Sequence, residues 1–160
     1  LVLAERRDVA PVVQPLLDDA SLNVVNLLSP LESTADYANL NIVKAVRNRN
    51  GDVIYLTRAP VPHFRQSVDV PVFRQTGIMA FRAEFLPKYS AMPETALEVA
   101  ESVDMLRLLE YGVRICGVVA DYVTIGVDRP SDVALVESAI QTDSLQRTLD
   151  ERIRMRGHAA

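Results

Sequence analysis

Two charged residues stand at the ends of predicted strands, where α/β proteins often place their chemistry. Asp128 ends an apolar strand predicted at residues 123–127, just before a helix predicted to begin at Pro130. In open α/β sheets, ligands collect outside the carboxyl ends of the strands, and a carboxylate there can hold Mg²⁺. A polar side chain at a helix entrance, favoured by the helix dipole, explains Asp128 equally well. The residues alone leave both interpretations open.

Arg58 presents a similar choice. It follows a strand predicted at residues 52–57 and precedes the segment Ala-Pro-Val-Pro. An arginine in this position can bind a carboxylate or a phosphate through two parallel hydrogen bonds. A solvated surface arginine is the commoner case. Arg65 and Arg74, within or at the end of a long loop predicted at residues 59–74, carry the same ambiguity.

Two acidic residues fall within a helix predicted at residues 95–111. Glu101 and Asp104 are three positions apart, so they are expected to share one face of that helix. They either point at a substrate or belong to the solvated face of an amphipathic helix, and the second interpretation is favoured.

Other residue types that often carry catalysis are sparse. His63 and His158 are far apart, and the single cysteine, Cys116, lies within a predicted strand, where a small buried hydrophobe is the favoured interpretation. One cysteine excludes a disulfide framework and a cysteine-based metal cage, and it favours a reducing, cytoplasmic location. The sequence contains no P-loop, Gly-x-Gly-x-x-Gly, Gly-x-Ser-x-Gly or His-Glu-x-x-His motif.

The composition is that of a globular domain with neither a nucleic-acid surface nor a membrane span. The 160 residues are 49% hydrophobic and 24% charged, with a net charge of −4, which excludes disorder. A mildly acidic balance gives no support to nucleic-acid binding, and the arginines of the tail alternate with acidic residues as in a solvated helix. Charges or prolines interrupt every apolar stretch well short of the ~18 residues of a membrane span.

The order of predicted elements is that of an α/β domain with an inserted β-hairpin. The hairpin joins strands at residues 42–47 and 52–57 through the turn Asn48-Arg49-Asn50-Gly51. A short helix at residues 83–89 is expected to stop near Pro87, and the long helix is expected to stop at Gly112. The other expected elements are helices at residues 7–19, 33–37 and from 130, and strands at residues 23–28, 76–82, 114–120 and 123–127.

Four blocks of sequence, taken together, narrow the choice of protein family. They are Asn50-Gly-Asp-Val-Ile-Tyr-Leu-Thr-Arg-Ala-Pro-Val-Pro62, Gly77-Ile-Met-Ala-Phe-Arg82 followed by Phe85, Leu86 and Tyr89, Glu101-Ser-Val-Asp-Met-Leu-Arg-Leu-Leu-Glu-Tyr-Gly112, and Gly126-Val-Asp-Arg-Pro-Ser-Asp132. In this order and spacing they resemble the 3-deoxy-manno-octulosonate cytidylyltransferases (CMP-KDO synthetases). The resemblance runs from about residue 8 to residue 140.

The resemblance implies a fold, a reaction and partners. The fold is a nucleotide-diphospho-sugar transferase-like α/β/α sandwich, here lacking its amino-terminal nucleotide-binding half. The reaction transfers CMP from CTP to an acidic sugar such as 3-deoxy-manno-octulosonate and releases pyrophosphate, with Mg²⁺ neutralising the phosphates. A homodimer and a place in lipopolysaccharide biosynthesis are implied as well.

Two residues carry over as catalytic. Asp128 matches the family's metal-binding aspartate, and Arg58 matches an arginine that faces the anionic substrate. The family's second metal-binding aspartate, in a Gly-Asp-Glu-Pro segment, has no counterpart, and neither has the loop that cradles the CTP phosphates. We therefore expect residues 1–142 to be the carboxyl-terminal part of a cytidylyltransferase domain, either as a fragment or completed by another chain. Residues 143–160 are expected to be a helical or frayed basic tail.

Four predicted substrate-binding positions depart from the family. Gln75 stands in place of His, Met79 in place of Tyr, and Asp104-Met105 in place of Glu-Gln. These positions surround the sugar, and a site that discriminates through buried hydrogen bonds does not lose them lightly. We expect cytidylyl transfer to be retained, with either 3-deoxy-manno-octulosonate or a different acidic acceptor, such as another 2-keto sugar acid or a phosphonate. Drift in a tolerant site and a non-catalytic dimerisation module are the competing hypotheses.

Overall fold

The computed structural model describes residues 6–31, 33–120, 133–134 and 136–138. The chain divides into two compact units, one of residues 4–124 and one of residues 1–3 with 125–160. In the second unit, residues 133–134 and 136–138 are helical, as expected for a helix beginning at Pro130. The predicted strand at residues 123–127 lies outside the described residues.

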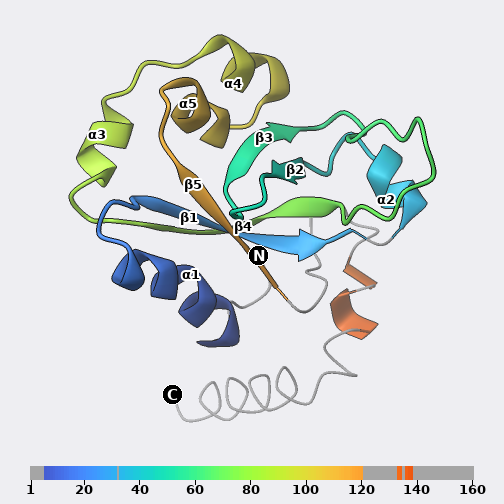
Figure 1. The fold of residues 1–160 in the computed structure, drawn as a ribbon, viewed down its shortest axis with the longest axis horizontal. Coiled ribbons are helices and arrows are strands. Elements are labelled where there is room, and N and C mark those ends of the chain that lie inside the picture. The colour runs from blue at the N-terminus through green and yellow to red at the C-terminus, as the bar shows by residue number, and fades with distance from the viewer. Residues whose placement is uncertain (1–5, 32, 121–132, 135, 139–160) are drawn as a thin grey trace, which may run out of the picture. The chain divides into compact units, whose positions relative to one another are not determined.

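Five strands of the first unit form one mixed sheet, in the order β3-β2-β4-β1-β5 (Figure 1). β1 pairs with β4 antiparallel and with β5 parallel, whereas β2 pairs antiparallel with both β3 and β4. The strands are β1 (Val24–Pro30), β2 (Lys44–Arg47), β3 (Val53–Thr57), β4 (Phe73–Phe81) and β5 (Ile115–Val119). The expected α/β class is confirmed.

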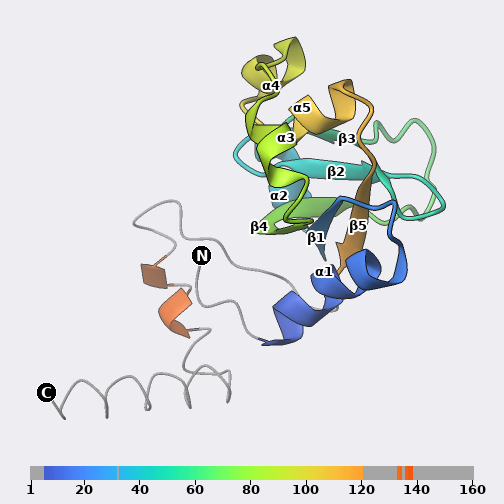
Figure 2. The ribbon, with the colours of Figure 1, turned by 90° about the vertical axis from the view of Figure 1, so that its left-hand side faces the viewer.

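Helices cover both faces of the sheet, α1 on one and α3, α4 and α5 on the other (Figures 1 and 2). The helices of the first unit are α1 (Arg6–Asp18), α2 (Thr34–Ala38), α3 (Leu86–Ser90), α4 (Ala96–Glu101) and α5 (Met105–Glu110). Because side chains alternate along a strand, β1 serves both layers. Val24 and Leu28 pack into the cluster that contains the buried residues of α5, whereas Val25 and Leu27 pack with those of α1.

The predicted hairpin of β2 and β3 is confirmed, and its turn lies against β5. Gly51 has a φ of +89° in this turn. Its carbonyl oxygen accepts a hydrogen bond of 2.9 Å from the amide of Gly117 in β5. A Cβ atom on Gly117 would lie 2.8 Å from Cδ1 of Leu28, so this strand position needs a residue without a side chain.

The long helix predicted at residues 95–111 is wrong, because the structure has two short helices there. α4 ends at Glu101, Ser102 takes a left-handed conformation with a φ of +51°, and α5 begins at Met105. Val99 in α4 is 63% exposed. The turn instead directs Met105 and its successors in α5 into the core.

A second correction concerns Pro87. This residue lies in the first turn of α3, so it begins the helix that it was expected to stop. The missing N–H of proline costs nothing there, since the first amides of a helix have no partner within it.

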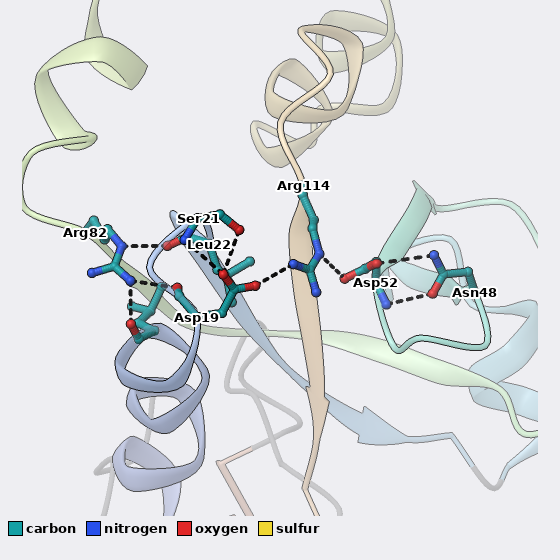
Figure 3. Close-up of polar contacts among 8 residues, drawn as sticks. Asp19, Ser21, Leu22, Asn48, Asp52, Arg82 and Arg114 are labelled. Carbon is teal, nitrogen blue, oxygen red and sulfur yellow. Dashed lines mark hydrogen bonds and ion pairs between the residues drawn. The ribbon is translucent and has the colours of Figure 1, made fainter.

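Arg82 fixes the end of α1 from the neighbouring sheet (Figure 3). Its guanidinium donates to the carbonyl oxygen of Leu22 at 2.7 Å, to that of Asp19 at 2.8 Å and to that of Leu16. These are carbonyls at and just beyond the helix end, where hydrogen-bond partners are lacking within the helix.

Arg114 links the loop after α1 to the hairpin (Figure 3). It donates to the carboxylates of Asp19 and Asp52, each at 2.7 Å. The hydroxyl and amide of Ser21 also donate to Asp19. These two bonds, followed by Arg114, lower the pKa of Asp19 to about 2.

Within the part of the chain that the structure describes, none of the helices combines the length and the apolar character needed to cross a membrane.

Candidate functional site

The end of β3 and the end of α4 are joined by Arg58 and Glu101. The Glu101 carboxylate accepts hydrogen bonds from the backbone amide of Arg58 at 2.8 Å and from the hydroxyl of Thr57 at 2.6 Å. In return, Nε of Arg58 donates to the carbonyl oxygen of Glu101 at 2.7 Å. We call this set of contacts the Arg58–Glu101 clamp.

Most N–H groups of the Arg58 guanidinium donate hydrogen bonds to backbone carbonyls. Besides the bond from Nε, Nη1 donates to the carbonyl oxygens of Leu40 and Asn41, both at 3.3 Å, and Nη2 donates to that of Ser102 at 3.2 Å. A guanidinium carries five N–H donors, so four of the five have partners in the protein. The catalytic and substrate-binding roles predicted for Arg58 stay predictions.

Glu101 is bound to β3, whereas the sequence favoured a solvated helix face for it. Hydrogen bonds from the Arg58 amide and then from the Thr57 hydroxyl lower the pKa of Glu101, so the carboxyl is ionised at neutral pH. Because α4 ends at Glu101, this residue and Asp104 do not share one face of a continuous helix. The expectation of a shared face is wrong for this reason.

Lys44 in β2 also contacts Arg58, and it was not singled out from the sequence. Its side chain is fully buried, and Nζ donates to the carbonyl oxygens of Asn39 (2.6 Å), Ile42 (3.0 Å) and Arg58 (2.9 Å). Burial, followed by the charge of Arg58, lowers the pKa of Lys44. The only signal in the sequence was a lysine with apolar residues on both sides in a predicted strand.

The four positions predicted to contact the sugar lie on β4 and at the start of α5. Met79 packs into the same cluster as Met105, on the sheet face covered by α5. Gln75 is paired with Leu28 in the register of β4 and β1, so it belongs to that face as well. Met105 is 0% exposed, so it presents no surface to a ligand. Asp104, which precedes it, is exposed.

Tyr89 packs on β4 and lies near Asp104. The ring of Tyr89 stacks on that of Phe81, with centroids 5.6 Å apart. Burial, followed by the nearby charge of Asp104, raises the pKa of Tyr89. The fold therefore brings Asp104 to the same side of the sheet as Met79, which no local sequence pattern required. Substrate binding by Gln75, Met79, Asp104 and Met105 stays a prediction.

An open depression of about 460 Å³ adjoins Asp104. It is lined by Glu94, Glu98, Val99, Ser102, Val103 and Asp104. Glu98 is paired with Arg107, whose Nε donates to the carboxylate at 2.7 Å and lowers the pKa of Glu98. The other carboxylates can accept hydrogen bonds from hydroxyl groups, and they repel an anion.

The described residues were compared with the requirements of a metal site. None of the described ranges contains a cluster of three or more His, Cys, Asp or Glu side chains suited to a metal ion. Asp128 lies outside the described residues, so its role as a metal ligand stays a prediction.

Comparison with known proteins shows relatives of one kind. The chain is 35% identical over 130 residues to the 3-deoxy-manno-octulosonate cytidylyltransferase of Acaryochloris marina, covering 81% of this chain and 53% of that protein. It is 34% identical over 142 residues to the protein of that name from Geobacter metallireducens, covering 82% and 56%. The chain therefore spans about half the length of the curated relatives it matches.

A solved structure and a family model agree with these relatives. The fold superposes with a TM-score of 0.79 and 33% identity on CMP:2-keto-3-deoxy-manno-octonic acid synthetase complexed with CTP, covering 86% of this chain and 57% of that one. Residues 2–115 match the model of a family described as cytidylyltransferase. The matched residues include the whole Arg58–Glu101 clamp, β4 and α5. The chain belongs to the cytidylyltransferase family.

Proposed function

We propose that this chain is the acceptor-side half of a cytidylyltransferase that moves CMP from CTP to 3-deoxy-manno-octulosonate. The observation that carries the proposal is the superposition on a synthetase complexed with CTP, at 33% identity over 86% of this chain. The relatives whose names give this activity match over a similar share of the chain. Since they are about twice as long, the complete reaction needs a further nucleotide-binding half, in a longer protein or in a second chain.

In this reaction a sugar oxygen attacks the α-phosphorus of CTP in line, the bond to the β-phosphate oxygen breaks, and pyrophosphate leaves. Positioning of the two substrates is the main task of the protein. Gln75 and Asp104 would bind hydroxyl groups of the acceptor from β4 and from the start of α5. Asp128 would hold Mg²⁺, which neutralises phosphate charge when it is bound.

The edge of β4 supports a missing half. On its β2 side, β4 pairs only near its beginning, where Phe73 and Arg74 face Ala45 and Lys44. The amide of Gln75 also donates to the carbonyl oxygen of Val43 at 2.8 Å, and among the described residues β4 from Thr76 to Phe81 has no strand on that side. An unpaired stretch within a sheet is a template for a further strand, which a nucleotide-binding half would supply.

The identity of the acceptor is the second part of the proposal. Met105 is buried and Met79 is packed against the core, so neither supplies the hydrogen bonds that the resemblance assigns to these positions. This favours, as an alternative acceptor, another 2-keto sugar acid or a phosphonate that makes fewer polar contacts.

The third part of the proposal is that the chain forms a homodimer. The loop after β3 leaves Phe64, Val68 and Val70 exposed, and apolar side chains grouped in one exposed segment are typical of protein interfaces. We propose that this loop pairs with that of a second copy. Sedimentation equilibrium should show a dimer, and Val68→Asp with Val70→Asp should convert it to a monomer; an unchanged mass would contradict pairing through this loop.

A reconstituted enzyme tests the catalytic proposal. The chain is joined to, or co-expressed with, the amino-terminal half of the Geobacter metallireducens relative, and CMP-sugar formation from CTP is followed by ³¹P NMR. 3-Deoxy-manno-octulosonate, other 2-keto sugar acids and phosphonates are compared as acceptors. A new phosphodiester signal with a sugar acid, or the signals of a mixed phosphonate–phosphate anhydride with a phosphonate, supports the proposal, and the best acceptor decides between the two forms of it. No product with any acceptor, from a folded complex that binds CTP, overturns it.

A further inference from the structure

The turn between α4 and α5 has an unusual backbone for its residue. Within the described ranges, Ser102 is the one non-glycine residue with a positive φ, +51°. A left-handed conformation is unfavourable for a residue with a Cβ atom, so the surroundings must hold it. The amide of Val103 donates across this turn to the carbonyl oxygen of Glu98 at 3.2 Å, and Asp104 and Met105 follow directly.

Arg58 binds two carbonyls at the carboxyl end of α4. Nε reaches the carbonyl oxygen of Glu101 at 2.7 Å, and Nη2 reaches that of Ser102 at 3.2 Å. A guanidinium at the carboxyl end of a helix also has a favourable charge for that position. The Glu101 carboxylate holds the amide of Arg58 in turn, so the contact is made from both sides.

We propose that Arg58 and Glu101 are positioning residues of the acceptor site, which set the place of Asp104 by holding the Ser102 turn. This inference rests on the proposed function. It differs from the role that the family resemblance implies for Arg58, which is contact with the anionic substrate.

The donors of Arg58 argue against direct contact. A bidentate grip on a carboxylate or phosphate needs two parallel N–H groups. With bonds to the carbonyls of Glu101, Leu40, Asn41 and Ser102, Arg58 has one N–H left. Binding a substrate in this way would require breaking a bond that maintains the turn.

Of the residues predicted to bind the acceptor, Asp104 lies nearest in the sequence to the Ser102 turn. Met105 is anchored in the core, and Gln75 and Met79 are fixed by the register of β4 with β1. Asp104 is exposed and lies two positions after Ser102, between Val103 and Met105, which are both buried. By holding the Ser102 turn, the clamp sets the path of the chain that leads through Val103 to Asp104.

The test uses Arg58→Lys with Arg82→Lys as its matched control. Arg82 also donates from its guanidinium to carbonyls at a helix end, but at α1 on the opposite face of the sheet. In the reconstituted enzyme, Arg58→Lys should raise KM for the acceptor about ten-fold or more, as small misplacements do, with KM for CTP little changed. Arg82→Lys should leave both KM values unchanged, although it also removes carbonyl contacts.

A double-mutant cycle with Asp104→Asn separates positioning from contact. If Arg58 acts through Asp104, Arg58→Lys should add little to the effect of Asp104→Asn. Glu101→Gln should behave in the same way. Independent, multiplying effects of Arg58→Lys and Asp104→Asn would show that Arg58 acts by itself and would overturn the inference. Equal KM effects of Arg58→Lys and Arg82→Lys would overturn it too, because the effect would then be general instability.

Hydrogen exchange of the chain alone keeps the inference testable if no acceptor is turned over. Arg58→Lys should speed exchange of the Val103 amide about ten-fold, since opening of the turn costs less without the clamp, while the Gly112 amide at the other end of α5 is unchanged. An unchanged rate at Val103 would contradict the clamp, whatever the reaction. Faster exchange at Val103 together with an enzyme inactive on every acceptor would reject the proposed function. The clamp would then have a structural role only.

Discussion

Arg58 and Glu101, 43 positions apart in the sequence, each bind the other's main chain. The Glu101 carboxylate accepts from the amide of Arg58 at 2.8 Å, and the Arg58 guanidinium donates to the carbonyl oxygen of Glu101 at 2.7 Å. The first residue after β3 and the last residue of α4 are thereby fixed to each other. Because each side chain satisfies a backbone group of the other residue, the loss of either one leaves a backbone group on the other element without that partner.

Glu101→Gln should lower the free energy of unfolding by about 1–2 kcal/mol at pH 7, because it weakens hydrogen bonds to a charged acceptor. The pKa of Glu101 is lowered from its ordinary value of 4.5 in the folded state. Its stabilising contribution is therefore complete above that value and is lost as the pH falls through the folded-state pKa. Urea unfolding between pH 7 and pH 3 should show a smaller loss of stability for Glu101→Gln than for the unmodified protein. An equal loss in both would mean that Glu101 is not held as described.

Lys44→Met should destabilise the protein by about 2–3 kcal/mol, since it leaves three buried or partly buried carbonyls without donors. The control is Lys88→Met in α3, where the side chain is exposed and a change within about 0.5 kcal/mol is expected. Chemical denaturation of both variants measures the difference. If Lys44→Met proved as harmless as Lys88→Met, the three hydrogen bonds of Nζ would carry no net stability.

Asp19 should make stability depend on pH in a lower range. Its pKa in the folded state is about 2, against an ordinary 3.8, so its contribution is present above about pH 4 and disappears as the pH falls toward 2. Thermal unfolding should show that Asp19→Asn removes part of the decline in Tm between pH 4 and pH 2. Parallel curves for the two proteins would place the bonds from Ser21 and Arg114 in doubt.

Gly117→Ala should destabilise the protein by about 1–3 kcal/mol through overpacking, since the new methyl group would meet Leu28 and Val53. Gly112→Ala is the comparison, because its Cβ atom would meet nothing within 4 Å and only the strain of its positive φ is expected, about 1 kcal/mol. Denaturation midpoints rank the two variants. A Gly117→Ala protein as stable as the unmodified one would show that the hairpin turn can move away from β5.

The sequence predicts those elements whose determinants are local. The turn at Asn48–Gly51 and the alternating residues beside it were sufficient for the hairpin, and Gly112 correctly marked the end of α5. The break at Ser102 was missed because its left-handed backbone is held by Arg58, which lies far away in the sequence. Helical spacing from residue 95 to residue 111 continues through the break and gives no sign of it.

The same distinction between local determinants and contacts distant in the sequence applies to the residues of the candidate site. The predicted strand at residues 76–82 contained Met79 but not Gln75, and no pattern gave the depth of Met105, which depends on where the turn directs α5. Lys44 was passed over because its burial depends on the loop at residues 39–42 that folds over it. Gly117 did carry a usable signal, since a glycine within a buried strand often marks a close approach of another backbone.

Pyrophosphate release from CTP tests the central claim most directly. The chain reconstituted with an amino-terminal half is assayed with the best acceptor and Mg²⁺, and Asp128→Asn is compared with the unmodified protein. Removal of a ligand to a metal that neutralises transition-state charge should lower the rate by about 100-fold or more, with the complex still assembled. A rate unchanged by Asp128→Asn would contradict the assignment of this residue to the metal, and no acceptor-dependent release from the unmodified complex would contradict the account of this chain as half of a cytidylyltransferase.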